Sequence, residues 1–468
     1  MNKVVSSLKE IIDLCGLKDG MTVSFHHHLR NGDYVLNMVM EAIAEKGIKN
    51  INVNASSVFD THQPLIGHIR NGVVTGLEAN YIGGVVGRAI SEGVLEKPVT
   101  FRTHGGRPAD ISTLNAPIDV AFIAAPTADT MGNCTGKYGK SACGSLGYAF
   151  ADAMYAKKVV VITDNLVPYP LADFSIPEVY VDYVLEVDSI GNPSGIVSGT
   201  TKITRDPVGL VMASYAAKAI EASGLLKDGM SFQTGAGGPS LAAAKFLMDI
   251  MLKKGVKGSF GLGGITKYMV DMMNAGCFES LLDVQCFDLD AVESIRTNPR
   301  HREISAMQYA SPASKSSAVD SLDVVILGAT QIDTDFNVNV HTDSNGYIMG
   351  GSGGHSDTAA GAKMAMIIAP LTRARLSIVV DKVLCTSTPG NTIDVLVTQH
   401  GIAVNEKYNK DLAQRFKDAG LPVCDICELK RIAEGITGVP KNVVPNGRTV
   451  ANVIYRDGTL LDTIKSVR

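Results

Sequence analysis

Residues 17–49 read LKDGMTVSFHHHLRNGDYVLNMVMEAIAEKGIK, and residues 226–257 read LKDGMSFQTGAGGPSLAAAKFLMDIMLKKGVK. Both stretches begin with LKDGM, continue through a short strand-like run, a loop and a long helical stretch, and end in KGIK or KGVK. The likeness resumes further along, where IDVAFIAA (118–125) matches LDVVILGA (322–329). Several matches in the same order indicate an internal duplication.

The duplication predicts two homologous domains, residues 1–215 and residues 216–468. In both halves an Asp-containing segment follows the second match, with Asn133 and Asn337 in similar places. Each half alternates short Val- and Ile-rich strands with longer helical patterns. This alternation is typical of α/β domains, whose mainly parallel sheets carry helices on both faces.

The composition excludes several classes of function. About 45% of the residues are hydrophobic and the net charge is −4, so the chain is globular and lacks the basic excess of a nucleic-acid-binding protein. No apolar run reaches the length of a membrane span, and the N-terminal stretch predicts an amphipathic helix. The eight cysteines form no disulfide framework, which indicates a cytoplasmic protein. Cys424 and Cys427 form a single CxxC pair, which we interpret as ordinary thiols.

Three glycine clusters in the second half predict a ligand site. They are QTGAGGP (233–239), GLGG (261–264) and GGSGGH (350–355), each expected between a strand and a helix. Unpaired N–H groups at such points bind anions or an oxyanion formed during acyl transfer. None of the three matches the phosphate-binding loop or the GxGxxG fingerprint, which argues against nucleotide binding and an NAD-type oxidoreductase.

The motifs resemble those of a known family. QTGAGGP and GGSGGHSDTAAGA are similar to the QxGxG and GxGGxxD motifs of class I CoA-transferases, which have two similar α/β domains. Over essentially the whole chain the sequence resembles the alpha subunits of citrate lyase within that class. The segments that carry this likeness are GGVVGRAISEG, FRTHGGRPADI, PTADTMGNCTGKYGKSACGSLGYAF and FGLGGITKYMV.

The resemblance implies a transferase inside a larger lyase. Such subunits exchange acetyl for citrate on an acyl-carrier thioester, giving a citryl thioester and acetate. The implied partners are a beta subunit, which cleaves the citryl thioester and is expected to use Mg²⁺, and a gamma acyl carrier protein. No covalently bound cofactor is implied, and CoA thioesters are possible substitutes for the carrier. An oligomeric complex in the cytoplasm is expected.

One departure from the CoA-transferase pattern affects the mechanism. Ordinary members use a glutamate nucleophile in a segment that corresponds here to GGITKYM. Tyr268 occupies the expected position of that glutamate, Lys267 precedes it, and the next glutamate downstream is Glu279. We therefore expect citrate to attack the acetyl thioester directly. The alternatives are a conventional CoA-transferase with a glutamyl-CoA intermediate, and a non-catalytic scaffold subunit.

The candidate site residues fall into three groups, and no metal site is expected because His26 to His28 lack acidic or Cys ligands at metal spacing. Oxyanion donors are expected at Gln233, Gly235, Gly237 and Gly238. The acyl or CoA pocket is expected at Gly261, Gly263, Gly264, Gly351, Ser352, Gly353, Gly354 and His355, although His355 fits a local helix-start role equally well. Citrate carboxylates favour cations and donors, and the candidates are Arg102, Arg107, His26, His28 and Arg30.

Overall fold

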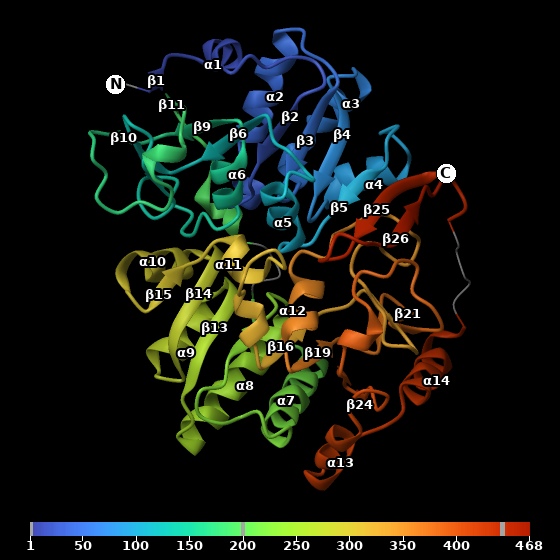
Figure 1. Ribbon diagram of the computed structural model, residues 1–468. Helices are drawn as coiled ribbons and strands as arrows, with labels where there is room; N and C mark the ends of the chain where they lie inside the picture. Colours follow the sequence, from blue (N-terminus) through green and yellow to red (C-terminus); the bar gives the residue numbers. More distant parts are fainter. Residues whose placement is uncertain (1–2, 198–201, 440–444) are drawn as a thin grey trace.

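A computed structural model of the protein describes residues 3–197, 202–439 and 445–468, and its first sheet combines the N-terminal half with the last two strands (Figure 1). The pairings are parallel from β1 to β25, and the β25–β26 pairing is antiparallel. In spatial order the strands are β1 (Val4–Val5), β11 (Tyr183–Glu186), β9 (Lys158–Thr163), β6 (Val120–Ala124), β2 (Thr22–Phe25), β3 (Ile51–Ala55), β4 (Val74–Ala79), β5 (Val99–Phe101), β25 (Thr449–Ile454) and β26 (Leu460–Lys465).

The second sheet repeats this arrangement. Its pairings are parallel except for β23–β24. In spatial order the strands are β15 (His301–Glu303), β14 (Phe278–Cys286), β13 (Gly258–Ile265), β12 (Phe232–Thr234), β16 (Val324–Leu327), β19 (Met364–Ile368), β23 (Val395–Thr398) and β24 (Gly401–Val404). The order β6-β2-β3-β4-β5 in the first sheet corresponds to β16-β12-β13-β14-β15 in the second.

The two small sheets that follow β6 and β16 also correspond. Their strands are β10 (Leu166–Val167), β7 (Thr127–Asp129) and β8 (Cys134–Thr135) in one, and β18 (Val338–Asn339), β17 (Gln331–Asp333) and β22 (Val379–Val380) in the other. In each, an aspartate carboxylate accepts a hydrogen bond from an asparagine amide four residues on, at 2.8 Å for Asp129–Asn133 and 3.2 Å for Asp333–Asn337. The prediction of two homologous, mainly parallel α/β units is therefore confirmed. The β20 (Thr372–Arg373) and β21 (Leu376–Ser377) pair forms a separate ribbon.

Helices cover both sheets. Around the first sheet they are α1 (Leu8–Leu14), α2 (Val35–Glu45), α3 (Leu65–Arg70), α4 (Gly84–Ser91), α5 (Gly106–Ser112) and α6 (Ala149–Tyr155). The others are α7 (Pro207–Ala222), α8 (Gly238–Lys254), α9 (Lys267–Asn274), α10 (Leu289–Thr297), α11 (Ala306–Ala310), α12 (His355–Gly361), α13 (Lys410–Asp418) and α14 (Ile426–Thr437). In the described part of the chain, none of these helices is both long and apolar enough to cross a bilayer.

The chain does not divide between the sheets where the duplication suggested. The expected boundary at 215–216 falls within α7, which begins at an Asp206 cap and packs on α8 in the second unit. The expected second domain, 216–468, also sends its last two strands back to the first sheet, where β25 pairs with β5. In Figure 1 this red hairpin lies beside the blue strands of the upper unit. The two units are therefore tied together by the chain itself.

Candidate active site

The two units meet where their parallel strands end, which is where open α/β sheets bind ligands. In Figure 1, α5, α11 and α12 lie between the sheets. Direct hydrogen bonds cross this boundary. The Gln285 amide donates to the His27 carbonyl at 3.0 Å, and the Asp357 carboxylate accepts from the Thr103 hydroxyl at 2.8 Å. Any ligand at this junction contacts both units.

An aromatic and imidazole cluster forms the first unit's side of the junction. The ring of His27 lies 4.7 Å from that of Tyr148, and 5.9 Å from the rings of both Phe59 and His104. His27 Nδ1 contacts the Ser56 hydroxyl at 2.6 Å. Burial lowers the pKa of His27 well below its usual value, so its ring is neutral. Neither Tyr148 nor Phe59 was predicted, because no motif marks them.

His26 and His28 are held by the backbone of neighbouring strands and helices. The Ala124 N–H donates to His26 Nε2 at 2.9 Å, the Tyr148 N–H donates to His28 Nε2 at 3.3 Å, and the two Nδ1 atoms contact each other. Burial lowers the pKa of His26 to about 4 and that of His28 well below its usual value. Both rings are therefore neutral and already bonded, which argues against our prediction that they bind citrate carboxylates.

Arg30 is a cation at the junction that still has a donor free to bind a ligand. The backbone of Arg30 has a φ of 51°. Its guanidinium lies 5.6 Å from the ring centre of Phe59 and 5.0 Å from that of Phe287. One guanidinium nitrogen, Nη1, is buried without a hydrogen-bond partner among the described residues. Burial lowers the pKa of Arg30 from its usual value. Stacked between two rings with a free donor, the guanidinium is oriented for a carboxylate.

Arg102 and Arg107 have other partners, which argues against their predicted role in citrate binding. Arg102 pairs with Glu78 and donates from Nε to Asp110 at 2.6 Å. Buried Arg107 forms a bidentate pair with Asp152 at 2.8 and 2.9 Å and bonds the Asn54 side chain at 2.7 Å. The Asp152 carboxylate already pairs with the buried Arg107 guanidinium, and a ligand that took Arg107 away would leave Asp152 buried and unpaired.

The QTGAGGP segment behaves partly as predicted. Gly237 caps α8 and Gly238 is its first residue, and neither N–H has a hydrogen-bond partner among the described residues. The Gly235 N–H, by contrast, donates to the Ile326 carbonyl at 2.9 Å and is not available. Two of the three predicted glycine donors therefore remain suited to an oxyanion.

Gln233 belongs to a cluster that the sequence did not predict. Its amide bonds the hydroxyl of Tyr309 on α11 at 3.0 Å. Gly263, at a φ of 103°, lies against that amide, and an added Cβ there would come within 2.7 Å of Gln233 Cδ. Gly354 lies against the Tyr309 hydroxyl in the same way, with an added Cβ 2.5 Å away. Bare backbone is therefore needed on both sides of the Gln233–Tyr309 pair.

The GLGG segment is not the strand-end loop that was expected. All four residues lie within β13, and Gly261 faces the core, where an added Cβ would come within 2.4 Å of Met269. Gly264 makes room for the ring of Phe287, which stacks on Arg30. Gly261 is therefore a packing residue, and Gly264 supports the arginine.

The GGSGGH loop packs the two units together rather than forming an open anion site. An added Cβ at Gly351 would lie 2.1 Å from the Asn80 carbonyl oxygen, and the Gly353 carbonyl accepts the His104 N–H at 2.8 Å. Ser352 is buried between these contacts. His355 is also buried: Nε2 donates to the Gly328 carbonyl at 2.8 Å and Nδ1 accepts from Thr388 at 2.7 Å. His355 is the first residue of α12, as one of its two predicted roles required, but its hydrogen-bond partners are distant in the chain rather than local.

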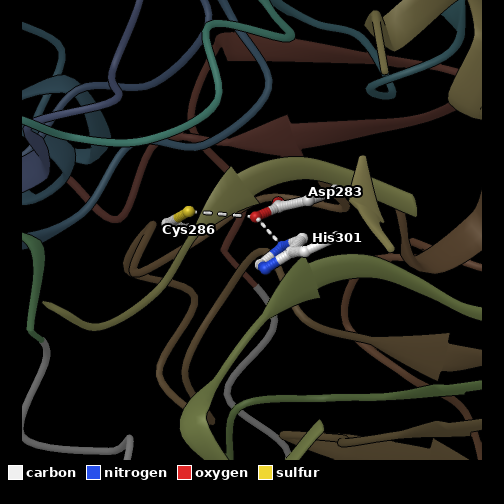
Figure 2. A group of neighbouring side chains, drawn as sticks. All are labelled: Asp283, Cys286 and His301. Atoms are coloured by element: carbon white, nitrogen blue, oxygen red, sulfur yellow. Dashed lines mark hydrogen bonds and ion pairs between the residues drawn. The ribbon is translucent and has the colours of Figure 1, made fainter. Parts of the chain in front are cut away.

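A buried Asp–Cys–His group lies near the same junction (Figure 2). Asp283 Oδ2 accepts from Cys286 Sγ and contacts His301 Nε2, each at 3.0 Å. These residue types bind metals, and their ligand atoms lie within 4.8 Å of one another. Burial raises the pKa of Cys286 well above its usual value, so in the absence of a metal ion the sulfur is protonated and donates to Asp283. The group is a hydrogen-bonded contact beneath Gly144 of the first unit.

Neither candidate for a protein nucleophile fits the site. Glu279 is exposed and pairs with Lys257 at 3.4 Å. It lies four residues before Asp283, the partner of Gly263 in the sheet, so it is about 13 Å away along the strand. Tyr268 is the second residue of α9, and the backbone N–H of Lys267, the first, donates to the Asp288 carboxylate at 2.7 Å. The Glu279 alternative is therefore disfavoured.

The paired parallel sheets and the glycine-lined junction define the class as CoA-transferase-like. The alpha subunit of malonate decarboxylase from Acinetobacter baumannii shares the fold, with a TM-score of 0.70 at 15% identity over 94% of this chain and 96% of that one. At that identity the likeness shows the fold alone.

Closer comparisons define the family. The sequence model described as citrate lyase, alpha subunit, matches residues 1–467. Citrate lyase alpha chains from Klebsiella pneumoniae and Haemophilus influenzae are both 48% identical over 100% of this chain, covering 92% and 93% of those chains. An alpha subunit of citrate lyase from Streptococcus mutans, solved in complex with citrate, aligns with a TM-score of 0.98 at 49% identity over 100% of this chain and 92% of that one. The chain belongs to the citrate lyase alpha-subunit family.

Proposed function

We propose that this chain transfers an acyl-carrier thiol from acetate to citrate: acetyl-S-carrier plus citrate gives citryl-S-carrier plus acetate. The observation that supports this most directly is Arg30, whose partner-free guanidinium nitrogen lies at the junction of the two units. A relative with 49% identity was solved in complex with citrate, which agrees with a carboxylate ligand for this family.

The residues at the junction favour direct attack by citrate. A citrate carboxylate oxygen attacks the acetyl carbonyl, the C–S bond breaks, and a mixed acetyl–citryl anhydride and a thiolate form. The thiolate then attacks the citryl carbonyl, and acetate leaves with the bridging oxygen. Each attack passes through an oxyanion, for which the free N–H groups of Gly237 and Gly238 are the proposed donors. The protein contributes by holding the two reactants together and stabilising these charges.

Arg30 and the neutral rings around it have different roles in binding citrate. The guanidinium neutralises one carboxylate, while His26, His27 and His28 remain uncharged and shape the pocket. A desolvated arginine gives a stronger bond to a carboxylate than an exposed one, because water competes less.

The proposed partners follow from the reaction. The thiol belongs to an acyl carrier protein, or to CoA in its place, so no covalently attached cofactor is needed on this chain. A beta subunit consumes the citryl thioester, and the three chains form an oligomeric complex that we expect in the cytoplasm.

Mass spectrometry of the isolated chain tests the proposal. The purified protein is mixed with citrate and acetyl-CoA, and in parallel with an acetylated acyl carrier protein, and both thioester pools are analysed. We expect a citryl thioester and free acetate in at least one mixture. An exposed-arginine variant, Arg431→Ala, is the matched control and should match the wild type. Absence of citryl thioester from both mixtures would contradict the proposed transferase activity.

A further inference from the structure

His104 lies at the centre of the junction, between the two units. It follows β5 and precedes α5, and its N–H donates to the Gly353 carbonyl of the second unit at 2.8 Å. Its ring lies 4.4 Å from that of Tyr148 and 5.9 Å from that of His27. Backbone and ring contacts therefore fix the direction of the imidazole.

The imidazole of His104 is unusual among those at the junction because it lacks a polar partner. Its Nδ1 is buried with no hydrogen bond, and Nε2 has none among the described residues. By contrast, His355 uses both nitrogens, and His27 uses Nδ1 on Ser56. Leaving a buried polar atom unpaired costs about 1–3 kcal/mol, so an orphan atom in a ligand site points to a bond made with the ligand.

The charge state of the His104 ring limits which chemical groups of a ligand can hydrogen-bond to it. Burial and, to a smaller extent, Arg107 lower the pKa of His104 to about 3, so the ring is neutral near pH 7. A neutral imidazole offers one N–H donor and one lone pair. A carboxylate only accepts hydrogen bonds and pairs more strongly with a cation such as Arg30. A hydroxyl group both donates and accepts, as a neutral imidazole does. The group on citrate that fits the ring is therefore its tertiary hydroxyl.

A row of neighbouring aromatic and imidazole rings links Arg30 to His104. The Arg30 guanidinium lies over Phe59, the Phe59 ring is 5.9 Å from His27, and His27 is 5.9 Å from His104. Both residues influence the pKa of His27, with Arg30 and His104 each lowering it. These contacts connect Arg30 to His104 through the rings of Phe59 and His27.

We propose that His104 hydrogen-bonds the tertiary hydroxyl of citrate and so selects citrate over tricarboxylic acids without that hydroxyl. This specificity role rests on the proposed transfer to citrate. Polar groups left unpaired by the wrong substrate discriminate far more strongly than an apolar pocket does. The acid that tests the difference is propane-1,2,3-tricarboxylic acid, which has the three carboxylates of citrate and no hydroxyl.

Transfer kinetics of the full chain with the two acids test the role. His104→Phe keeps the ring stacked on Tyr148 and removes both nitrogens, while His104→Gln retains a donor and an acceptor. His400→Phe, at an exposed turn, is the matched control and should equal the wild type. We expect His104→Phe to lower kcat/KM for citrate tenfold to a hundredfold and to change it less than threefold for the deoxy acid, with partial recovery in His104→Gln.

The outcomes separate the two hypotheses. Equal losses for both acids in His104→Phe, or an unchanged preference for citrate, would overturn the role of His104 while wild-type transfer to citrate still held. Wild-type protein that makes no citryl thioester would instead refute the proposed function. Circular dichroism melting of each variant shows whether it is folded, and a folded His104→Gln that transfers to citrate no faster than His104→Phe would also overturn the role of His104.

Discussion

At the residue scale, we expect citrate binding to depend most on Arg30. Arg30→Ala removes the partner-free guanidinium at the junction, and a charge-assisted hydrogen bond contributes about 1.5–3 kcal/mol. We expect the KM or Kd for citrate to rise by roughly tenfold to a hundredfold. Calorimetric titration with citrate measures the change, and Arg431→Ala serves as the exposed control. Citrate affinity within twofold of wild type in Arg30→Ala would rule out the assigned contact.

Asp357 gives the second residue-scale prediction, a pH-dependent stability. Burial, opposed by bonds from Gly105 and Thr103, raises its pKa from 3.8 to about 6. Between these values the folded state holds a proton that the unfolded state has released, so stability decreases as pH rises. Asp357→Asn lacks this decrease and should gain about 2 kcal/mol relative to wild type between pH 4.5 and 7. Urea unfolding at several pH values measures the difference, and a flat or opposite trend would contradict the assigned ionisation.

The sequence suggests the role of a site residue only where that role depends on nearby residues. Arg30, Gly237 and Gly238 were proposed from residue type and motif, and each keeps a donor without a partner among the described residues. Arg102 and Arg107 were proposed in the same way, but their carboxylate partners, Glu78 and Asp152, are distant in the chain and could not be foreseen. Tyr309 was missed because its bond to Gln233 exists only in the folded protein. Side-chain availability is a tertiary property that residue type alone does not contain.

At the element scale, the glycines of the GGSGGH loop serve close packing between the units rather than the anion binding that the motif suggested. The loop was predicted as an anion site, yet Gly351 makes space for the Asn80 carbonyl of the other unit. Gly351→Ala would bring a Cβ within 2.1 Å of that oxygen, and backbone cannot move aside as a flexible side chain can. We expect the free energy of unfolding to fall by about 2–4 kcal/mol.

Denaturant unfolding tests this effect against a glycine with free space. Gly328→Ala is the matched control, because an added Cβ there meets no atom within 4 Å. The control should lie within about 0.5 kcal/mol of wild type. Equal stabilities for Gly351→Ala and wild type would mean that the loop is not packed between the units as described.

At the scale of the whole molecule, the internal repeat predicted the fold because each copy forms its own strand–helix units from nearby residues. The correspondence of β6-β2-β3-β4-β5 with β16-β12-β13-β14-β15 follows from that repetition. The return of β25 and β26 to the first sheet could not be predicted. The pairing of β25 with β5 joins residues far apart in the chain, and within the described residues neither β25 nor β26 has a counterpart beside β15 in the second sheet.

The returning hairpin predicts that the two units unfold together. Val453 is 1% exposed and pairs with Phe101 in the first sheet, although the chain reaches β25 only after forming the second sheet. Val453→Ala should destabilise the protein by about 2 kcal/mol and shift a single calorimetric transition to lower temperature. Leu460→Ala, on the same hairpin but 60% exposed, should change little. A second, separate transition in either variant would show that the units unfold independently.

Tyr268 stands where the CoA-transferase pattern has its nucleophilic glutamate, which makes direct attack by citrate the central claim. One single-turnover experiment tests it: citrate labelled with ¹⁸O in its carboxylates is mixed with excess enzyme and the acetyl thioester, and the first acetate released is analysed. Direct attack predicts acetate that carries one ¹⁸O atom, because the bridging oxygen of the mixed anhydride comes from citrate. Unlabelled acetate, with ¹⁸O appearing instead in an enzyme carboxylate, would contradict direct attack and establish a covalent enzyme intermediate.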